Sequence, residues 1–385
     1  MKLTFRATLI ALAASALITL AACNPGTTGL FSYIGQETKD VSGSLTKATV
    51  TSMAEDSANY YVAGGGKLFS RTIAAGTWEK VTITNQNWYR AVRSVGNTSV
   101  YALAATAIDT DPVVFYGASW APVTLSGGEV PEDLVPVVGS DGHSVVAVVV
   151  VTKTTVQTTK TAFNTVYVLG DSGAATRVDL GAAFGADVGT KVLSAAYDGT
   201  NMYLLNDTAL FTASFNPASV AVGSLTQVTG PPAGLDYAAI LSVSGSTATL
   251  DGFYLATKKL NSAGSSIYRS TSGTSWGSPT TLVTNAKASS VAIEVTSMVF
   301  PAASAPCVYV GTESAGYGEL TATAISPWAA TPVATTITGG YDATALPTSY
   351  VTLLYVAANG TNPVFLGADT LGLWAHSADN KWSQE

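Results

Sequence analysis

The feature that most constrains the fold is a pair of adjacent residues, one aliphatic and one aromatic, that recurs along the chain about every 50 residues. The sixth copy lacks the aromatic residue but keeps its place in the series. The copies are Leu68-Phe69, Val114-Phe115, Val166-Tyr167, Leu210-Phe211, Ile267-Tyr268, Leu320-Thr321 and Leu373-Trp374. A fixed period of this length is typical of folds built from repeated small sheets.

Two further patterns keep the same period. An aromatic–aliphatic pair precedes most copies, as Tyr61-Val62, Tyr101-Ala102, Tyr203-Leu204, Tyr254-Leu255, Tyr309-Val310 and Phe365-Leu366. The third repeat has the apolar run Val145–Val151 instead. A tryptophan follows the pair in five repeats, as Trp78, Trp120, Trp276, Trp328 and Trp382. Because the chain has seven tryptophans in all, five at one repeat position are not a chance arrangement.

Each repeat is predicted to form four short strands separated by turns rich in Gly, Asn and Asp. In the first repeat the strands are expected at Ala48–Met53, Tyr60–Ala63, Lys67–Thr72 and Thr77–Ile83. In the fourth they are expected at Val192–Tyr197, Met202–Leu205, Ala209–Ser214 and Ser224–Val228. Four strands per repeat predict an all-β fold, a seven-bladed β-propeller of four-stranded antiparallel blades over residues 47–385.

The turn before one tryptophan carries a family resemblance. Ser270–Trp276 resembles a shortened Asp-box, the turn motif of BNR and sialidase-like propeller repeats, without its aspartate. Arg71–Trp78 and Ser377–Trp382 are more degenerate copies. In that family the box is a structural turn, so the resemblance implies a propeller architecture and no catalytic residue. All four strands of the seventh blade are expected from the C-terminal end of the chain.

The N-terminus has the layout of a secretory signal, with Lys2 and Arg6 before the apolar stretch Leu9–Ala22. Its last residues, Leu20 to Cys23, resemble the lipobox of bacterial lipoproteins. The resemblance implies cleavage before Cys23 and attachment of acyl chains such as palmitate to its thiol, which anchor the protein to a lipid bilayer. Residues 1–22 are then a signal peptide and residues 23–46 a flexible tether. In enterobacteria-like sorting, an Asp after the cysteine resembles an inner-membrane retention signal. Asn24 stands there instead, and this absence of Asp favours the outer membrane.

Charge and cysteine content exclude several classes. The formal net charge is −7 and Lys and Arg are not clustered, which argues against nucleic acid as a partner. With Cys23 acylated, Cys307 has no disulfide partner and is expected to be a small buried apolar residue. His143 and His376 lie far apart, and the aspartates lack calcium-loop spacing, so no metal or cofactor is expected.

Sequence evidence for catalysis is weak. A sialidase needs three converging arginines, but Arg71, Arg177 and Arg269 are expected on outer strands. A glycosidase needs two acids flanking one bond. The acids expected in loops at the rim of the central funnel are Glu132, Asp133, Asp236 and Asp342.

Aromatic residues beside hydrogen-bonding groups are the candidate ligand-binding residues of the funnel loops. They are Trp88, Tyr89, Arg90, Asp236, Tyr237, Tyr341 and Asp342. The alternative is that these rings plug the funnel or pack on the blade below. The long hairpin Thr152–Ala162 is a second candidate, as a contact arm.

The sequence therefore predicts a non-catalytic binding or scaffolding lipoprotein of the cell envelope. One alternative is a hydrolase or lyase acting on an envelope glycan. Another is a component of outer-membrane assembly, by fold-level analogy with an eight-bladed lipoprotein propeller of that machinery.

Overall fold

The chain divides into two compact units, residues 1–42 and 43–385, and the computed structural model describes residues of the second. The described residues are 45, 48–74, 76–126, 129–141, 144–157, 160–181, 190–231, 234–244, 250–258, 265–273, 276–277, 280–281, 283–286, 289–292, 295–300, 307–313, 317–321, 350–359, 364–376 and 382–385. The predictions for Cys23, the tether before residue 45, His143, Trp328, Tyr341 and Asp342 lie outside them.

The described part of the chain is built from short strands. The first two sheets contain β1 Val50–Glu55, β2 Asn59–Gly64, β3 Lys67–Thr72 and β4 Glu79–Val81, then β5 Trp88–Val95, β6 Ser99–Ala105, β7 Val113–Tyr116 and β8 Ala121–Pro122. The central strands are β9 Val130–Val138, β10 Val145–Gln157, β11 Lys160–Ala162, β12 Thr165–Leu169, β13 Ala175–Asp179, β14 Ser194–Tyr197, β15 Asn201–Leu205, β16 Leu210–Asn216, β17 Ala221–Val222 and β18 Thr226–Gln227.

The remaining strands complete the C-terminal part. They are β19 Tyr237–Val243, β20 Gly252–Thr257, β21 Ser266–Ser270, β22 Thr280–Thr281, β23 Val283–Ala286, β24 Ser289–Ala292, β25 Val295–Val299, β26 Cys307–Thr312, β27 Tyr317–Thr321, β28 Val351–Val356, β29 Val364–Ala368, β30 Gly372–His376 and β31 Trp382–Gln384.

Within each sheet, strands that follow each other in sequence pair antiparallel. This order holds for β1 to β4, β5 to β8, β19 to β22 and β28 to β31, and for the shorter sheet β25 to β27. Strands β9, β10, β12 and β13 form a similar unit, which a parallel pairing of β9 with β14 joins to the next unit. Consecutive strands of a repeat therefore pair with one another, as the sequence predicts, although the third and fourth repeats share one sheet and β23 and β24 form a separate two-stranded sheet.

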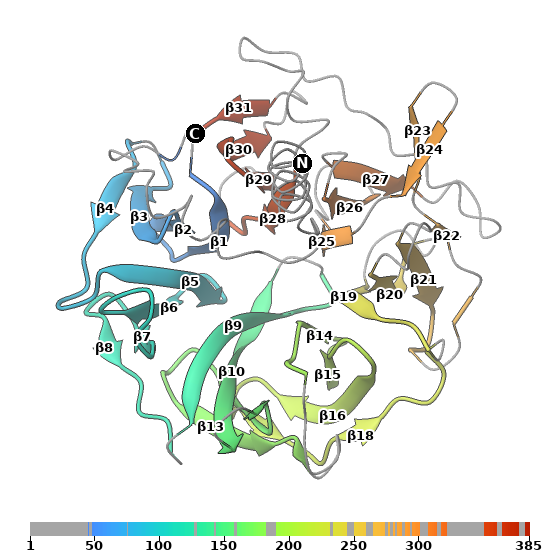
Figure 1. Ribbon diagram of the computed structural model, residues 1–385, viewed down its shortest axis with the longest axis horizontal. Coiled ribbons are helices and arrows are strands. Elements are labelled where there is room, and N and C mark those ends of the chain that lie inside the picture. Colours follow the sequence, from blue (N-terminus) through green and yellow to red (C-terminus); the bar gives the residue numbers. More distant parts are fainter. Residues whose placement is uncertain are drawn as a thin grey trace, which may run out of the picture. The chain divides into compact units, whose positions relative to one another are not determined.

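Strands β1, β5, β9, β14, β19, β25 and β28 lie on the inside of the unit (Figure 1). In order, β1, β5, β9, β14, β19, β25 and β28 each contact the next, and β28 contacts β1. We call these the inner strands. Hydrogen bonds link neighbours: Thr51 Oγ1 donates to the Arg90 carbonyl at 3.2 Å, and Ser194 Oγ donates to the Ile240 carbonyl at 3.3 Å. The sheets are thus arranged around one common centre.

The repeated aliphatic–aromatic pairs lie on the third strand of each sheet, as predicted, and the pairs that precede them lie on the second. Alternation along a strand sends the two residues of a pair to opposite faces. Leu68 packs in the cluster shared with β5 and β6, whereas Phe69 packs in the cluster shared with β29 and β30. Both faces of the sheet are therefore buried, which explains why the strands are apolar throughout.

The repeated tryptophans lie at the start of the fourth strand or just before it. Trp78 and Trp120 directly precede β4 and β8, whereas the sequence places Trp78 inside a longer strand. Each is half-buried against the sheet before its own. The Trp120 ring packs edge-on against Tyr61, with centroids 5.9 Å apart, and Trp276 packs on the cluster that contains Tyr203. The tryptophan at this repeat position therefore packs across the contact between consecutive sheets.

The last sheet is complete without a strand from the N-terminal part of the described chain. Side chains join it to the first sheet: Thr49 Oγ1 donates to Asp369 at 2.5 Å, and Arg71 pairs with Glu385 at 3.0 Å. Glu55, at the end of β1, accepts hydrogen bonds from the backbone N–H groups of Ala358 and Asn359. The two ends of the described unit are therefore closed by side-chain contacts and packing.

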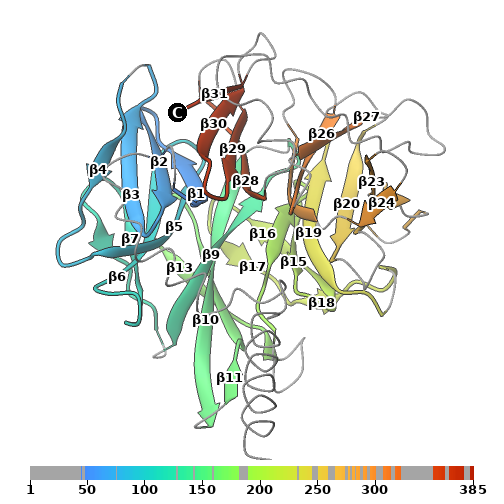
Figure 2. The same cartoon turned by 45° about the horizontal axis from the view of Figure 1, so that its top comes forward.

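Strand β10 extends beyond its sheet and turns back as β11 (Figure 2). Its pairing with β9 ends at Lys153, opposite Val130, and its pairing with β12 covers only 148–151. The hairpin predicted at Thr152–Ala162 is thus confirmed as a hairpin. It stands at the end of the unit where β9 begins, which we call the hairpin face.

Candidate functional site

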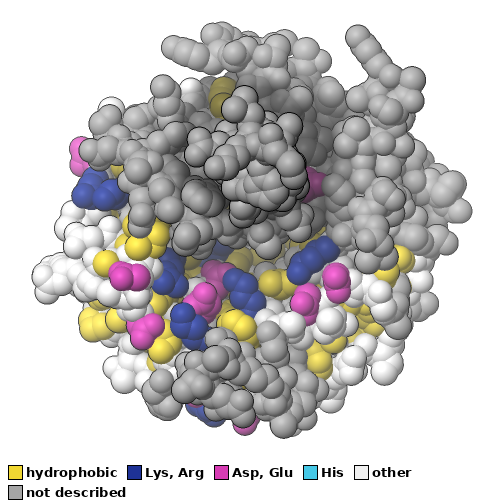
Figure 3. Space-filling model, in the orientation of Figure 1, with side chains coloured by type: hydrophobic (Ala, Val, Ile, Leu, Met, Phe, Trp, Pro, Cys, Tyr) yellow, Lys and Arg dark blue, Asp and Glu magenta, His cyan; other side chains and the backbone are white. Residues whose placement is uncertain are grey.

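The hairpin face carries a line of paired charges. Glu132 on β9 lies 3.7 Å from Arg90 on β5 and 2.8 Å from Lys153 at the base of the hairpin. The next residue, Asp133, pairs with Lys191 at 3.2 Å. All five side chains are about a quarter to two-fifths exposed, so they are accessible to a partner. Figure 3 shows cationic and anionic side chains alternating across the described surface on this side.

Arg90, Glu132 and Asp133 lie within strands, which corrects the sequence prediction that they belong to funnel loops. Strand β5 begins at Trp88 and β9 at Val130, so all three residues lie near the start of an inner strand. A strand position fixes them more firmly than a loop would. The prediction erred because polar residues at a strand end have the same composition as a loop.

Trp88 and Tyr89 have different surroundings. The half-buried Trp88 ring covers the turn between β2 and β3, where a Cβ on Gly66 would lie 2.4 Å from the ring. Tyr89 is 3% exposed, and its hydroxyl accepts a hydrogen bond from the Ile83 N–H at 2.8 Å. Tyr89 thus packs beneath the surface, as the alternative interpretation expects of these rings.

Asp236 and Tyr237, the next two candidate residues, also differ in exposure. Tyr237 is 2% exposed and packs between β15 and β20, where burial raises the pKa of its hydroxyl. Asp236, one residue earlier, is exposed. The structure therefore leaves Arg90, Asp236 and part of Trp88 accessible among the described candidates.

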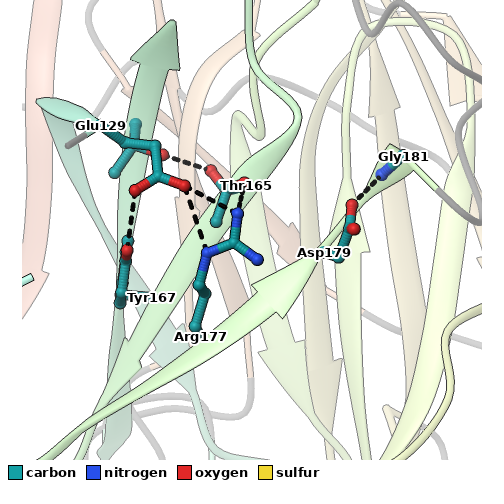
Figure 4. A network of polar contacts seen from close by, with 7 residues as sticks. Glu129, Thr165, Tyr167, Arg177, Asp179 and Gly181 are labelled. Atoms are coloured by element: carbon teal, nitrogen blue, oxygen red, sulfur yellow. Dashed lines mark hydrogen bonds and ion pairs between the residues drawn. The ribbon is translucent and has the colours of Figure 1, made fainter. Parts of the chain in front are cut away.

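A polar cluster that the sequence does not reveal lies beside the hairpin (Figure 4). Arg177 on β13 binds one carboxylate oxygen of Glu129 through Nη2 at 2.7 Å and Nε at 3.2 Å. The Tyr167 hydroxyl donates to the other oxygen at 2.9 Å. Burial is the largest single influence and favours the protonated acid. The hydrogen bonds from Arg177, from the backbone N–H of Glu129 and from Tyr167, with the charge of Arg177, together outweigh it and hold the pKa of Glu129 below its usual value. Strong hydrogen bonds keep this carboxylate charged and fixed.

On the opposite face, the sequence predicts a tight turn at 198–201, but not its recurrence at Asp56 or the role of its aspartate. Asp198 accepts hydrogen bonds from the Thr200 and Asn201 N–H groups and from the Tyr203 hydroxyl at 2.9 Å. Asp56 binds the corresponding groups of its own repeat, including the Tyr61 hydroxyl at 2.8 Å. The signal is the spacing Asp-x-x-Asn-x-Tyr at the turn into the second strand. Because both aspartates hold their turns, they are structural residues.

The centre of the described unit contains a cavity of about 210 Å³. Residues from every inner strand line it, and most are apolar or small. Polar lining residues include Arg93, Ser94, Ser297 and Tyr355. Below the cavity, the buried Glu55 accepts a hydrogen bond from the Tyr355 hydroxyl at 3.2 Å. Burial raises the pKa of both groups.

The arginines considered for a sialidase site do not lie together in the described structure, and neither do possible metal ligands. Arg71, Arg177 and Arg269 lie on β3, β13 and β21, third or fourth strands of their sheets, as the sequence predicts. Among the described residues, no group of three His, Cys, Asp or Glu side chains could hold a metal ion. No helix within the described ranges is long and apolar enough to span a membrane.

Comparisons with known proteins identify the fold. No family model matches the chain. No curated protein matches it in sequence. Its structure is similar to YCF48 from Cyanidioschyzon merolae, with a TM-score of 0.52 and 12% identity over 85% of this chain and 95% of that chain.

Two further solved structures are similar. A catalytically inactive virginiamycin B lyase from Staphylococcus aureus gives a TM-score of 0.51 and 9% identity, over 85% of this chain and 94% of that one. The Dos1 propeller gives a TM-score of 0.50 and 10% identity, over 88% of this chain and 84% of that chain. The fold is therefore a β-propeller. At such low identity the likeness concerns the fold alone, and the similar structures include an enzyme as well as other proteins.

Proposed function

We propose that the chain is a lipid-anchored lipoprotein of the cell envelope, whose propeller binds or scaffolds a protein partner without catalysis. The observation that carries the proposal is the hairpin face, where the β10–β11 hairpin stands beside the paired charges of Arg90, Glu132 and Lys153. A projecting strand pair next to partly exposed charges suits recognition of a protein surface, because charge complementarity sets orientation and on-rate.

The architecture we propose is seven blades of four strands each. The order of inner-strand contacts, from β1 to β28 and back to β1, supports seven blades. The complete sheets, such as β1 to β4 and β28 to β31, support four strands in each. The anchor at Cys23 and the outer-membrane location are proposed from the N-terminal sequence pattern alone.

The test is site-specific photo-crosslinking of the whole chain in its native envelope. A photoreactive residue replaces Thr155 in the hairpin or, as the matched control, Lys80 on the outer strand β4. We expect a discrete protein adduct from position 155 and none from position 80. A second experiment places the photoreactive residue at position 153, at the base of the hairpin. The adduct formed there should disappear when residues 154–161 are replaced by a two-residue Asn-Gly turn.

Two outcomes would contradict the proposal. Equal labelling from positions 155 and 80 would mean that the hairpin is not a contact surface. Capture of glycan alone would favour the alternative of a glycan hydrolase or lyase, and Glu132, Asp133 and Asp236 would be the first acids to substitute. Capture of outer-membrane assembly proteins would identify the partner class and support the scaffold proposal.

A further inference from the structure

The central cavity is lined by a cation that has no carboxylate in direct contact among the described residues. Arg93, on β5, lines the cavity. Its Nε donates to the Leu134 carbonyl at 3.2 Å and its Nη1 to the Val92 carbonyl at 3.4 Å. Among the described residues, no carboxylate oxygen lies within 4 Å of the Arg93 guanidinium. A guanidinium has five N–H donors, so several of those on Arg93 have no acceptor among the described residues.

Arg93 differs in this respect from arginines nearer the surface. Arg71, Arg90 and Arg177 each reach a carboxylate, at 3.0, 3.7 and 2.7 Å. Asp133, the acid that attracts the Arg93 guanidinium at longer range, is paired with Lys191. Burial lowers the pKa of the Arg93 guanidinium, but arginine does not lose its proton in proteins. A partly buried charge with no counter-ion in contact is costly, so this position favours an anion.

The lining of the cavity limits what that anion can be. Met53, Val135, Ile240 and Leu354 provide apolar walls. The hydroxyl groups of Thr352 and Ser194 already donate to the carbonyls of neighbouring inner strands. Few donors are left for a polyanion such as phosphate. A carboxylate needs only the two parallel N–H donors of one guanidinium.

Ser297 provides a second polar group in the cavity. Its hydroxyl oxygen is buried, lines the cavity from β25, and has no hydrogen-bond partner among the described residues. The cavity volume of about 210 Å³ is smaller than the pockets of drug-sized ligands, which begin near 300 Å³. The occupant must therefore be small.

We propose that the central cavity binds a small monocarboxylate, with its carboxylate on Arg93 and its apolar body against the inner strands. This site is independent of the hairpin face and of the lipid anchor. Either proposal can therefore fail without the other.

The test measures thermal unfolding of the whole purified chain with sodium butanoate as the probe. Butanamide is the matched uncharged probe, and inorganic phosphate is the control anion. We expect about 10 mM butanoate to raise the unfolding temperature in a saturable manner, and neither control compound to do so at that concentration. Arg93→Met should weaken butanoate binding at least tenfold, whereas Lys80→Met, which removes an exposed positive charge on β4, should not.

Arg93→Lys is the second variant, because it keeps the charge even if Arg93→Met does not fold. Lysine lacks the paired donors, so binding should again weaken about tenfold. The proposal is overturned if butanoate has no effect on the wild-type chain, if phosphate or butanamide acts equally well, or if either Arg93 variant binds butanoate as the wild type does.

Discussion

Glu55 accepts a hydrogen bond from the backbone N–H of Ala358 at 2.6 Å, although the two residues are 303 positions apart. The contact joins the first inner strand to the loop after the last one. Glu55 is 2% exposed, and burial raises its pKa above 4.5. The Glu55 side chain therefore links the first and last sheets of the propeller.

Glu55→Ala should lower the free energy of unfolding by about 2 kcal/mol, because the N–H groups of Ala358 and Asn359 lose their acceptor in a buried place. Glu55→Gln keeps one acceptor oxygen and removes the buried charge. Urea denaturation monitored by tryptophan fluorescence measures both. Equal stability of the alanine variant and the wild type would show that the joint does not depend on this contact.

The raised pKa of Glu55 also predicts the pH dependence. The folded state binds this proton more tightly than the unfolded state, so stability falls as pH rises from about 4.5 through the folded pKa. Glu55→Gln should remove that component, and its unfolding free energy relative to the wild type should rise with pH. A constant difference across this range would contradict the assignment.

Glu129 should behave in the opposite sense. Its pKa lies below the usual value of 4.5, so its contribution is present above that pH and is lost as pH falls through the folded pKa. Arg177→Met should therefore reduce stability at neutral pH by up to about 1 kcal/mol, since the arginine is 44% exposed and solvent screens the pair. The loss should vanish in acid. Denaturation curves at several pH values measure it.

Gly66→Ala should displace the Trp88 ring. Gly66 has a φ of 72°, and an added Cβ would lie 2.4 Å from that ring. Strain and steric overlap together should cost about 2 kcal/mol. The fluorescence of Trp88 should shift towards that of an exposed indole. Its emission is obtained by subtracting the spectrum of the matching Trp88→Phe protein. An unchanged spectrum and stability would mean that Trp88 does not cover this turn.

Trp276→Ala should destabilise the fold by about 2 kcal/mol, less than a fully buried tryptophan, because the ring is half-buried between sheets. Its indole nitrogen is buried without a hydrogen-bond partner among the described residues. Trp276→Phe should therefore cost much less, since it keeps the packing and removes an unsatisfied donor. Similar losses from both variants would contradict the view that the indole N–H is an unsatisfied donor whose removal costs nothing.

Cys23→Ser should abolish acylation and release the protein from membranes. Partition into a detergent phase distinguishes the two forms, because acyl chains carry the protein into detergent. Lys80→Ser is a control that leaves the signal unchanged. If the Cys23→Ser protein still enters the detergent phase, the lipid anchor at this residue is disproved.

The repeats made most of the fold predictable. Leu68-Phe69 and Tyr61-Val62 predict their strands because both faces of each sheet are buried, so the pattern is local and repeated. Strand ends were less well predicted: β4 begins at Glu79, beyond Trp78, since a half-buried tryptophan at a sheet joint resembles a strand residue.

The sites were harder to predict because they depend on distant partners. Nothing near Arg93 in the sequence indicates that its Nε donates to the Leu134 carbonyl on β9. Glu129 and Arg177 lie 48 positions apart, and their pairing needs the third sheet to be in place. Tyr89 and Tyr237 look like binding residues in sequence but are buried by adjacent strands.

Closure by side chains has a consequence for how the molecule forms during synthesis. Each sheet uses consecutive residues, so a growing chain can complete its sheets one after another as it emerges. The face of the first sheet that carries Val62 and Phe69 is an exception, because its cover comes from Phe365 and Leu373. That apolar face stays open to water, and to misassembly with other chains, until the final residues are made.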